Sequence, residues 1–449
     1  MIVKLKALIS PENSRNRMLR NNILLSGVIK AVGLFTSLLV VPATLDYLDK
    51  EQYGIWMTIS SILIWFSFFD VGLGNGMRNY LAQSISTGDY RKGRIYLSTT
   101  LAMLTCIALL LIVVSTVCTF SLDLNKVFNT SAVGSQQLTA ALLIATVFTL
   151  FQFVVKNVGL VYVAMQRYAI NDLLIVSGNV VALIIVYIIT KTTETNLLYI
   201  VLTFTATPVI IFLLAAIPLF VRYPQLRPSL SSVDPAFARQ ILGKGLGFFF
   251  IQITSVLVIF GSANIFIAQA LGQEAVTTYN IAYKFFNLLI IAYTIVIAPM
   301  WNAYTDASVK GDFVWIGATL NRTLTVWCLT LLAGIAMLAL SGLFYRLWVG
   351  QSVQVPFTVS CCVFIYASLF NLNSGVTALI NGVNKIHVQI ITSVVFTVLY
   401  IVAVSLWGMR HGIEGIVICM AASYAAMSII HLYQCRLIIN RRAKGIWNK

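Results

Sequence analysis

Long apolar runs recur along the whole chain with short polar segments between them. A helix of about 20 apolar residues crosses the hydrocarbon core of a bilayer. In lipid every backbone polar group must be paired within its own segment, so runs of this length form helices. The sequence therefore predicts an all-α polytopic membrane protein with twelve transmembrane helices, at 22–47, 53–74, 96–121, 138–164, 171–190, 197–221, 245–271, 277–303, 320–343, 357–381, 388–408 and 413–435.

The composition excludes several classes of protein. Hydrophobic residues make up 59% of the chain and charged residues only 10%, whereas a soluble globular protein has about 25% charged residues. A water-soluble enzyme, a disordered chain and a nucleic-acid-binding protein are therefore excluded. The net charge of +16 has to be explained by where the basic residues lie.

The basic residues predict the orientation. If the N-terminus lies in the cytoplasm, 22 of the 30 Lys and Arg residues fall in cytoplasmic segments and five in outside segments. Cytoplasmic loops carry the excess of Lys and Arg, so both termini are expected in the cytoplasm. The segment Met1–Asn22 contains neither a long apolar core nor a small-residue cleavage site, so we expect the first span to be a permanent anchor.

The two halves of the chain repeat short motifs in the same order. Glu51 and Glu274 precede spans 2 and 8, and Gly88-Asp89 and Gly311-Asp312 follow them, with the same spacing from glutamate to glycine in both halves. Gln166-Arg167 and Asn384-Lys385 follow spans 4 and 10 at a similar offset. Two six-helix lobes related by a parallel repeat are predicted. We expect an N-terminal lobe at 1–221, a cytoplasmic linker at 222–243 and a C-terminal lobe at 244–449.

Three lysines inside predicted spans are the main candidate binding residues: Lys30, Lys156 and Lys284. A charge at mid-membrane costs ~2.5–3.5 kcal/mol on insertion scales. Lys30 also lies on one helix face with Asn22, Ser26, Gly33 and Ser37, a polar stripe that favours water or another helix over lipid. The three lysines are therefore expected to line a central cationic cavity that attracts an anion. The alternative is that each lysine snorkels to a headgroup.

Further polar residues are predicted to line the same cavity, where they would suit hydrogen bonding to sugars. Amides and hydroxyls within spans also join helices to one another, so helix packing remains open for each of them. The predicted cavity lining is Asn22, Ser26, Ser37, Gln152, Gln252, Ser255, Asn280 and Asn287.

Asp70 precedes the glycine-rich run Gly72-Leu73-Gly74-Asn75-Gly76 at the predicted cytoplasmic end of span 2. We expect Asp70 and Arg78 to form a cytoplasmic gate, with Asp70 pairing with Arg78 or Lys30 or capping the break at the glycines. The seven cysteines and three histidines have no ligand spacing, so neither a metal site nor a cofactor is predicted.

These motifs resemble those of a known family. The segment Tyr53-Gly54-Ile55-Trp56, followed by Asp70-Val71-Gly72-Leu73-Gly74, is similar to the start of bacterial polysaccharide-biosynthesis membrane proteins. Gly88-Asp89 and Leu347-Trp348-Val349-Gly350 are similar as well. These proteins are the O-antigen (Wzx-type) flippases of the multidrug/oligosaccharidyl-lipid/polysaccharide exporter superfamily.

The resemblance implies a transporter of the bacterial cytoplasmic membrane and not an enzyme. Its substrate would be an undecaprenyl-diphosphate-linked oligosaccharide, an O-antigen or similar repeat unit used in lipopolysaccharide biosynthesis. Two lobes would carry it from the cytoplasmic to the periplasmic leaflet by alternating access. The implied partners are the lipid bilayer, H⁺ or Na⁺ as coupling ion, and polysaccharide polymerase and chain-length proteins, with no nucleic acid.

Three alternatives remain open. A cation-coupled multidrug or small-molecule exporter of the same superfamily would need an interior carboxylate, which is scarce in the spans. A membrane glycosyltransferase or polymerase would need a catalytic acid pair or an external arginine cluster, and the sequence has neither. A non-catalytic component of a glycan assembly complex would require no specific site residues.

Overall fold

The structure is a computed structural model. It describes the backbone of residues 14–70, 72–239, 261–351 and 353–448, and the side chains of these residues except 14–24, 26, 67, 68, 75 and 302. Within these ranges the regular secondary structure is helical. Ten helices in them are long and apolar enough to cross a membrane. The predicted all-α polytopic fold is confirmed.

The predicted spans map onto these helices with two exceptions. The second predicted span is α3 (Lys50–Phe68), a 19-residue helix outside those ten. Most of the seventh predicted span lies outside the described residues, and its end is α13 (Ala263–Leu271).

The chain forms two compact units, and each is described by itself. Unit 1 comprises Met1–Asp49, Leu63–Asn125 and Val133–Phe249, and unit 2 comprises Lys50–Ile62, Lys126–Ala132 and Phe250–Lys449. The first part of α3 thus belongs to unit 2 although it comes early in the sequence. The boundaries between the predicted lobes and linker stay a prediction.

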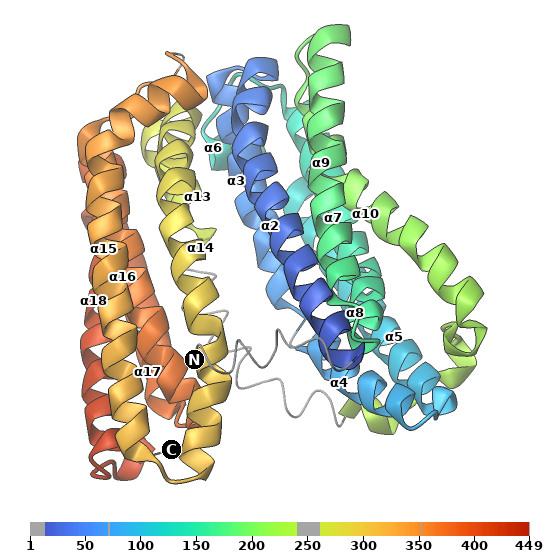
Figure 1. The fold of residues 1–449 in the computed structure, drawn as a ribbon. Coiled ribbons are helices and arrows are strands. Elements are labelled where there is room, and N and C mark those ends of the chain that lie inside the picture. Colours follow the sequence, from blue (N-terminus) through green and yellow to red (C-terminus); the bar gives the residue numbers. More distant parts are fainter. Residues whose placement is uncertain (1–13, 71, 240–260, 352, 449) are drawn as a thin grey trace. The chain divides into compact units, whose positions relative to one another are not determined.

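Unit 1 is a helical bundle in which α2 lies along α9, and α10 packs on α7 and α9 (Figure 1). Its helices are α2 (Ser14–Tyr47), α4 (Leu73–Ser86), α5 (Tyr90–Ser121), α7 (Ser135–Val155), α8 (Asn157–Ala164), α9 (Tyr168–Thr192) and α10 (Leu197–Arg222), with the short η1 (Pro224–Leu226) and η2 (Leu230–Ser232) after them. The short α6 (Leu124–Phe128) begins in unit 1 and ends in unit 2.

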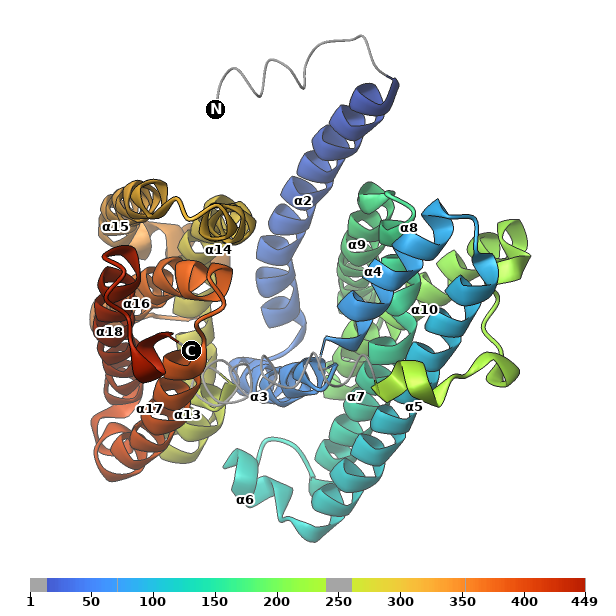
Figure 2. The ribbon, with the colours of Figure 1, turned by 90° about the horizontal axis from the view of Figure 1, so that it is seen from below.

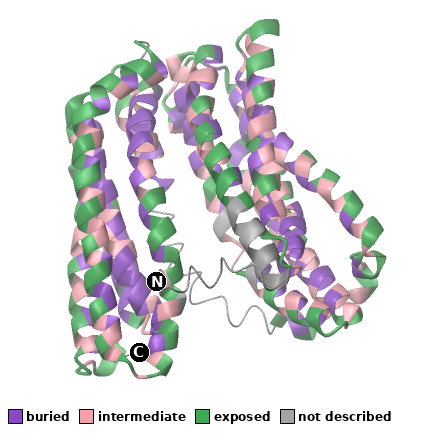
Figure 3. Cartoon of the chain, viewed as in Figure 1, coloured by how far each residue is buried: buried purple, intermediate pink, exposed green. Residues whose placement is uncertain are grey.

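Unit 2 is built around α16, which packs against α14, α15 and α18 (Figure 2). Its elements after α13 are α14 (Gln273–Val309), α15 (Phe313–Val349), α16 (Phe357–Gly382), α17 (His387–Leu406), η4 (Gly408–His411), α18 (Gly412–Ile439) and η5 (Gly445–Asn448). Much of α15 is exposed (Figure 3), and its exposed residues include the large apolar Leu329, Leu332 and Leu343. Such a surface is expected where lipid covers a helix.

The repeated turns have the same backbone in both units. Gly88 and Gly311 have φ angles of 75° and 70°, which glycine adopts without strain. In each case the following aspartate donates its N–H to the carbonyl five residues earlier at 2.9 Å. Its carboxylate then caps a helix by accepting the N–H three residues on, at 3.0 Å for Asp89 and 2.9 Å for Asp312. The N–H of Lys92 holds the pKa of Asp89 below its ordinary value.

A second pair of turns agrees in the same way. Gln166 and Asn384 both have positive φ angles, 61° and 57°. The next residue donates its N–H to the carbonyl five positions earlier, at 2.9 Å for Arg167 and 3.1 Å for Lys385. The agreement of both pairs supports the six-plus-six duplication predicted from the sequence.

Candidate functional site

Lys30 of α2 forms an ion pair with Asp172 of α9 in unit 1. The Lys30 Nζ lies 3.7 Å from the Asp172 Oδ2, and the two side chains are 68% and 20% exposed. α2 and α9 approach each other closely about one turn after Lys30, since a Cβ at Gly33 would come within 2.8 Å of the Val176 side chain. Ile29, Ala169 and Val176 form a buried apolar cluster at this contact. Asp172 was not among the residues predicted from the sequence.

Lys156 lies at a break between two helices of unit 1. It is the residue between the end of α7 and the start of α8. Its Nζ lies 5.2 Å from the centre of the Phe153 ring. The Asn157 side chain donates to the backbone carbonyls of Phe153 and Val154 at 3.2 and 3.0 Å. These side-chain bonds accompany the interruption of the helix at mid-span.

Asp70 caps a helix in place of pairing with Arg78. Its Oδ1 accepts the N–H of Gly74 at 3.0 Å, in the first turn of α4. Arg78 donates to the Asn79 side chain at 3.2 and 3.4 Å. Of the alternatives predicted for Asp70, the structure therefore has the cap. The role of Asp70 and Arg78 as a gate stays a prediction.

Lys284 of α14 contacts an aromatic residue in unit 2. Its Nζ donates to the Tyr53 hydroxyl at 3.3 Å and lies 5.9 Å from the centre of the same ring. Tyr53 is 1% exposed. Among the described residues Lys284 forms no ion pair, so its ammonium is stabilised by a neutral hydroxyl and a π-face.

Tyrosines gather beside Lys284. The rings of Tyr279 and Tyr283 stack with centroids 6.0 Å apart, and Tyr283 continues to Tyr366 at 6.5 Å. Tyr424 lies 5.8 Å from Tyr366. The Tyr283 hydroxyl donates to Asn287 Oδ1 at 3.3 Å. Tyr279, Tyr366 and Tyr424 are buried, so the cluster packs the interior of unit 2, and Tyr283 and Asn287 are its half-buried polar members near Lys284.

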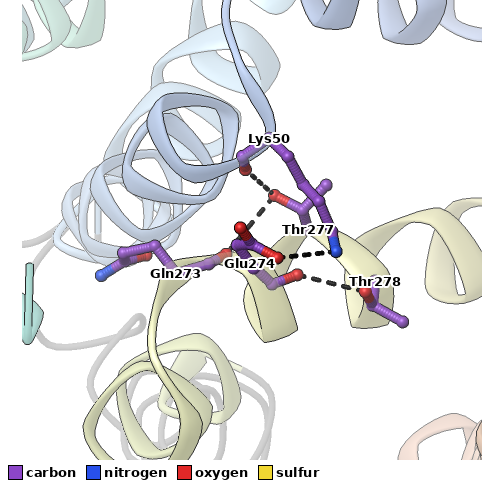
Figure 4. A network of polar contacts seen from close by, with 5 residues as sticks. All are labelled: Lys50, Gln273, Glu274, Thr277 and Thr278. Carbon is purple, nitrogen blue, oxygen red and sulfur yellow. Dashed lines mark hydrogen bonds and ion pairs between the residues drawn. The ribbon is translucent and has the colours of Figure 1, made fainter. Parts of the chain in front are cut away.

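Asn280, one turn before Lys284, joins helices within unit 2. It donates to Asn264 Oδ1 at 2.9 Å, and Asn264 in turn donates to the Ser61 hydroxyl at 2.5 Å. At the start of the same helices Lys50 pairs with Glu274 at 2.9 Å, and Thr277 donates to the Lys50 carbonyl at 2.7 Å (Figure 4). These bonds attach the first part of α3 to α13 and α14.

Gly54 of the sequence motif explains how closely these helices approach. A Cβ at Gly54 would overlap the backbone oxygen of Gln273. Gln273 also accepts from the Thr58 hydroxyl at 2.9 Å. The motif around Tyr53 therefore serves two purposes: its glycine permits the contact, and its tyrosine meets Lys284.

The remaining predicted residues are placed as follows. Ser37 is exposed and donates to the Leu34 carbonyl at 2.7 Å, and Gln152 is half-buried one turn before Lys156. Asn22 and Ser26 belong to α2, but their side chains lie outside the described residues, as do Gln252 and Ser255 entirely. In the described ranges no group of three or more His, Cys, Asp or Glu residues is placed to hold a metal ion.

Comparison with solved structures defines the fold class. An inward-facing multidrug resistance MATE family transporter of the MOP superfamily matches with a TM-score of 0.76 and 15% identity, over 93% of this chain and 98% of that one. The lipid II flippase MurJ, in an inward closed conformation, matches with a TM-score of 0.67 and 13% identity, over 92% and 87%. The chain has the MATE and MurJ fold.

Sequence comparison gives one further relative. A Salmonella typhi protein named "Putative O-antigen transporter" is 23% identical over 279 residues, which is 61% of this chain and 62% of that protein. No protein-family model matches the chain. The resemblance drawn from the sequence motifs is confirmed, because the sequence relative is named as an O-antigen transporter and the structural neighbours are a MATE transporter of the MOP superfamily and a lipid II flippase.

Proposed function

We propose that this protein is a flippase for an undecaprenyl-diphosphate-linked oligosaccharide, an O-antigen or similar surface-glycan repeat unit. It would move the lipid from the cytoplasmic to the periplasmic leaflet of the bacterial inner membrane by alternating access of two lobes, with both termini in the cytoplasm. No covalent bond is made or broken in this process, so the proposed protein is not an enzyme and needs no cofactor.

The observation that carries the proposal is a lysine inside a membrane-length helix of each unit. Lys30 lies in α2 of unit 1 and Lys284 in α14 of unit 2, and both helices are long and apolar enough to cross a membrane. Intramembrane ionisable residues are rare and mark substrate pathways. A diphosphate would meet ammonium groups, and the half-buried Tyr283 and Asn287 near Lys284 would meet sugars.

Without substrate, the ammonium groups of the two lysines have different partners. Asp172 lies 3.7 Å from Lys30, a separation longer than a charge-assisted hydrogen bond of about 2.7–2.9 Å. We infer that a diphosphate displaces Asp172 when it binds and that Asp172 returns when the diphosphate leaves. Among the described residues Lys284 has the neutral Tyr53 hydroxyl as its partner at 3.3 Å, so no carboxylate there competes with the substrate.

The test is transport of a defined lipid-linked oligosaccharide in vesicles that contain the purified protein. Lys30→Ala and Lys284→Ala would each lower the transport rate by about 100-fold, because a lost charged contact costs ~2–5 kcal/mol. Lys191→Ala is the matched control, since Lys191 is an exposed lysine at the end of α9. Normal transport by both variants, with normal transport by the control, would refute the proposal.

A second candidate is a cation-coupled exporter of small organic cations. It is favoured by Asp172, a carboxylate near the start of α9 that is 20% exposed, and by the multidrug transporter in the structural comparison. This candidate predicts that overexpression lowers ethidium accumulation and that Asp172→Asn abolishes this effect. The flippase predicts no effect on ethidium.

For the proposed flippase, either H⁺ or Na⁺ would drive the transport cycle. Polysaccharide polymerase and chain-length proteins would be its neighbours.

A further inference from the structure

A cavity of about 360 Å³ lies at the end of unit 2 that carries the C-terminal segment. Its walls come from three connections: the α14–α15 turn with Gly311, the α16–α17 turn with Lys385, and the segment after α18 with Arg441 and Ala443. None of these residues belongs to the proposed substrate pathway. The charge count of the sequence places all three connections on the cytoplasmic side.

The two basic side chains of the cavity are fixed in position. Arg441 donates from Nη2 to the Gly311 carbonyl at 3.0 Å, and its guanidinium lies 4.8 Å from the centre of the Phe313 ring. Lys385 donates from Nζ to the Asn448 carbonyl at 2.7 Å. The main-chain carbonyl of Lys385 accepts from Gln434 at 2.9 Å. Hydrogen bonds therefore join the α16–α17 turn to the C-terminal segment and hold the walls of the cavity in place.

Both cations have neutral partners. Within the described ranges neither Lys385 nor Arg441 forms an ion pair with a carboxylate. An ammonium has three donor hydrogens and a guanidinium has five, so the carbonyl bonds leave donors for a ligand. Two uncompensated cations at the wall of one cavity favour a phosphate anion, which accepts charge-assisted hydrogen bonds from both kinds of group.

Unit 1 carries a larger side chain at the same distance along the chain from its last helix. Leu226 lies four residues beyond Arg222, the last residue of α10. It is completely buried, and its Cδ2 would lie 3.0 Å from a Cβ at Gly93 of α5. In unit 2 the residue four positions beyond Ile439, the last residue of α18, is Ala443. Unit 1 thus has a buried leucine four residues after its last helix, whereas unit 2 has the smaller alanine at the wall of the cavity.

We propose that this cavity binds the phosphate of an anionic phospholipid of the cytoplasmic leaflet. Its position at the ends of α14, α15, α16 and α18 is the headgroup level of the predicted spans. Its wall is also partly apolar, with Val383 and Ile438 beside the two cations. The neighbouring Trp447 and Tyr433 rings lie 5.3 Å apart. Tryptophan and tyrosine are enriched at membrane interfaces. A mixed cationic and apolar wall suits a lipid headgroup better than free phosphate.

The experiment counts retained lipid by native mass spectrometry on the full chain, purified with phosphatidylglycerol or with phosphatidylcholine. Lys385→Gln with Arg441→Gln would reduce retained phosphatidylglycerol by about tenfold or more, since each basic group near the surface contributes ~1 kcal/mol to anionic-lipid binding. Ala443→Leu would reduce it by filling the cavity without changing the charge. Arg442→Gln with Lys444→Gln is the matched control, because it removes the same charge just outside the cavity and should retain the lipid.

Three results would overturn the proposal. One is unchanged retention in both the double variant and Ala443→Leu. Another is an equal loss in the Arg442/Lys444 control, which would mean diffuse attraction to the tail. The third is release of the lipid by millimolar inorganic phosphate but not by chloride of the same ionic strength, which would assign the cavity to free phosphate. The readout does not depend on transport, so it can succeed if the proposed flippase activity fails.

Discussion

The two units share their turns and differ in what surrounds their polar groups. Gly88-Asp89 in unit 1 and Gly311-Asp312 in unit 2 have the same φ sign, the same hydrogen bonds and the same helix cap. By contrast Lys30 has a carboxylate partner, whereas Lys284 has the Tyr53 hydroxyl. The two units therefore agree in the backbone of their turns and differ in the partners of their lysines.

The units also differ in how the chain leaves their last helix. A buried leucine follows α10, and the cavity with Lys385 and Arg441 follows α18. The chain leaves the last helix with a different backbone in each unit, since Tyr223 after α10 has a φ of −125° and Arg441 after α18 has a φ of 57°. Substitutions in one unit can therefore be compared with substitutions in the other.

The largest effect is expected from reversing the lysine charges. Lys284→Glu would abolish surface glycan, a loss of at least about 100-fold, in a strain whose own flippase is deleted. Lys30→Glu would do the same, and adding Asp172→Lys would restore glycan because it returns an ammonium to nearly the same position. Glycan would be measured on gels at equal protein levels. Full glycan in Lys284→Glu would show that the unit 2 lysine is not needed.

Substitutions after the last helix of each unit should change the stability of the two units by different amounts. Leu226→Ala would lower the free energy of unfolding of unit 1 by ~2–5 kcal/mol, because it leaves a cavity in a buried apolar cluster. Ala443→Leu would change the stability of unit 2 by less than ~1.5 kcal/mol, since the space is already present. Thermal unfolding in detergent would compare them. Equal destabilisation by both variants would mean that the two ends are packed alike.

The shared turns should respond equally to loss of glycine. Gly88→Ala and Gly311→Ala would each cost ~1–2 kcal/mol, because an L-residue with positive φ is strained while the space around each site is open. Unfolding in detergent would again report the difference. A cost in only one unit would contradict the common turn geometry.

The smallest effect is expected from neutralising the partner of Lys30. Asp172→Asn removes a pair whose lysine is 68% exposed, and such pairs are worth ~0–1 kcal/mol. Stability should therefore barely change, while binding of a lipid diphosphate should become severalfold tighter and its release slower. Equilibrium binding and single-turnover release would be measured separately. Weaker binding would mean that Asp172 positions Lys30 and does not compete with the substrate.

The sequence predicted the helices because apolar runs are a local pattern. It also identified Gly88-Asp89 and Gly311-Asp312 as a repeated motif, but the left-handed glycine and the helix cap at each became known only from the structure. Asp70 was correctly offered as a helix cap, since the glycines after it need one. The sequence also placed Lys30 and Lys284 inside spans, because the distance of each lysine from the end of its predicted span can be counted along the chain.

The partners of these residues could not be predicted. Asp172 and Lys30 are far apart in sequence, and only the packing of α2 on α9 brings the two together. The same holds for Tyr53 and Lys284, which were noticed separately. The helix break at Lys156 has no proline or glycine at that residue to signal it. The difference between Leu226 and Ala443 gains meaning only when their surroundings are known.

The most direct measurement compares two lipid headgroups. Vesicles containing the wild-type protein or Lys284→Gln would be given the same oligosaccharide on undecaprenyl diphosphate and on undecaprenyl monophosphate, and the ratio of the two transport rates would be determined. If ammonium groups recognise the diphosphate, the wild type prefers the diphosphate and Lys284→Gln loses most of that preference. An unchanged ratio in Lys284→Gln would contradict the account.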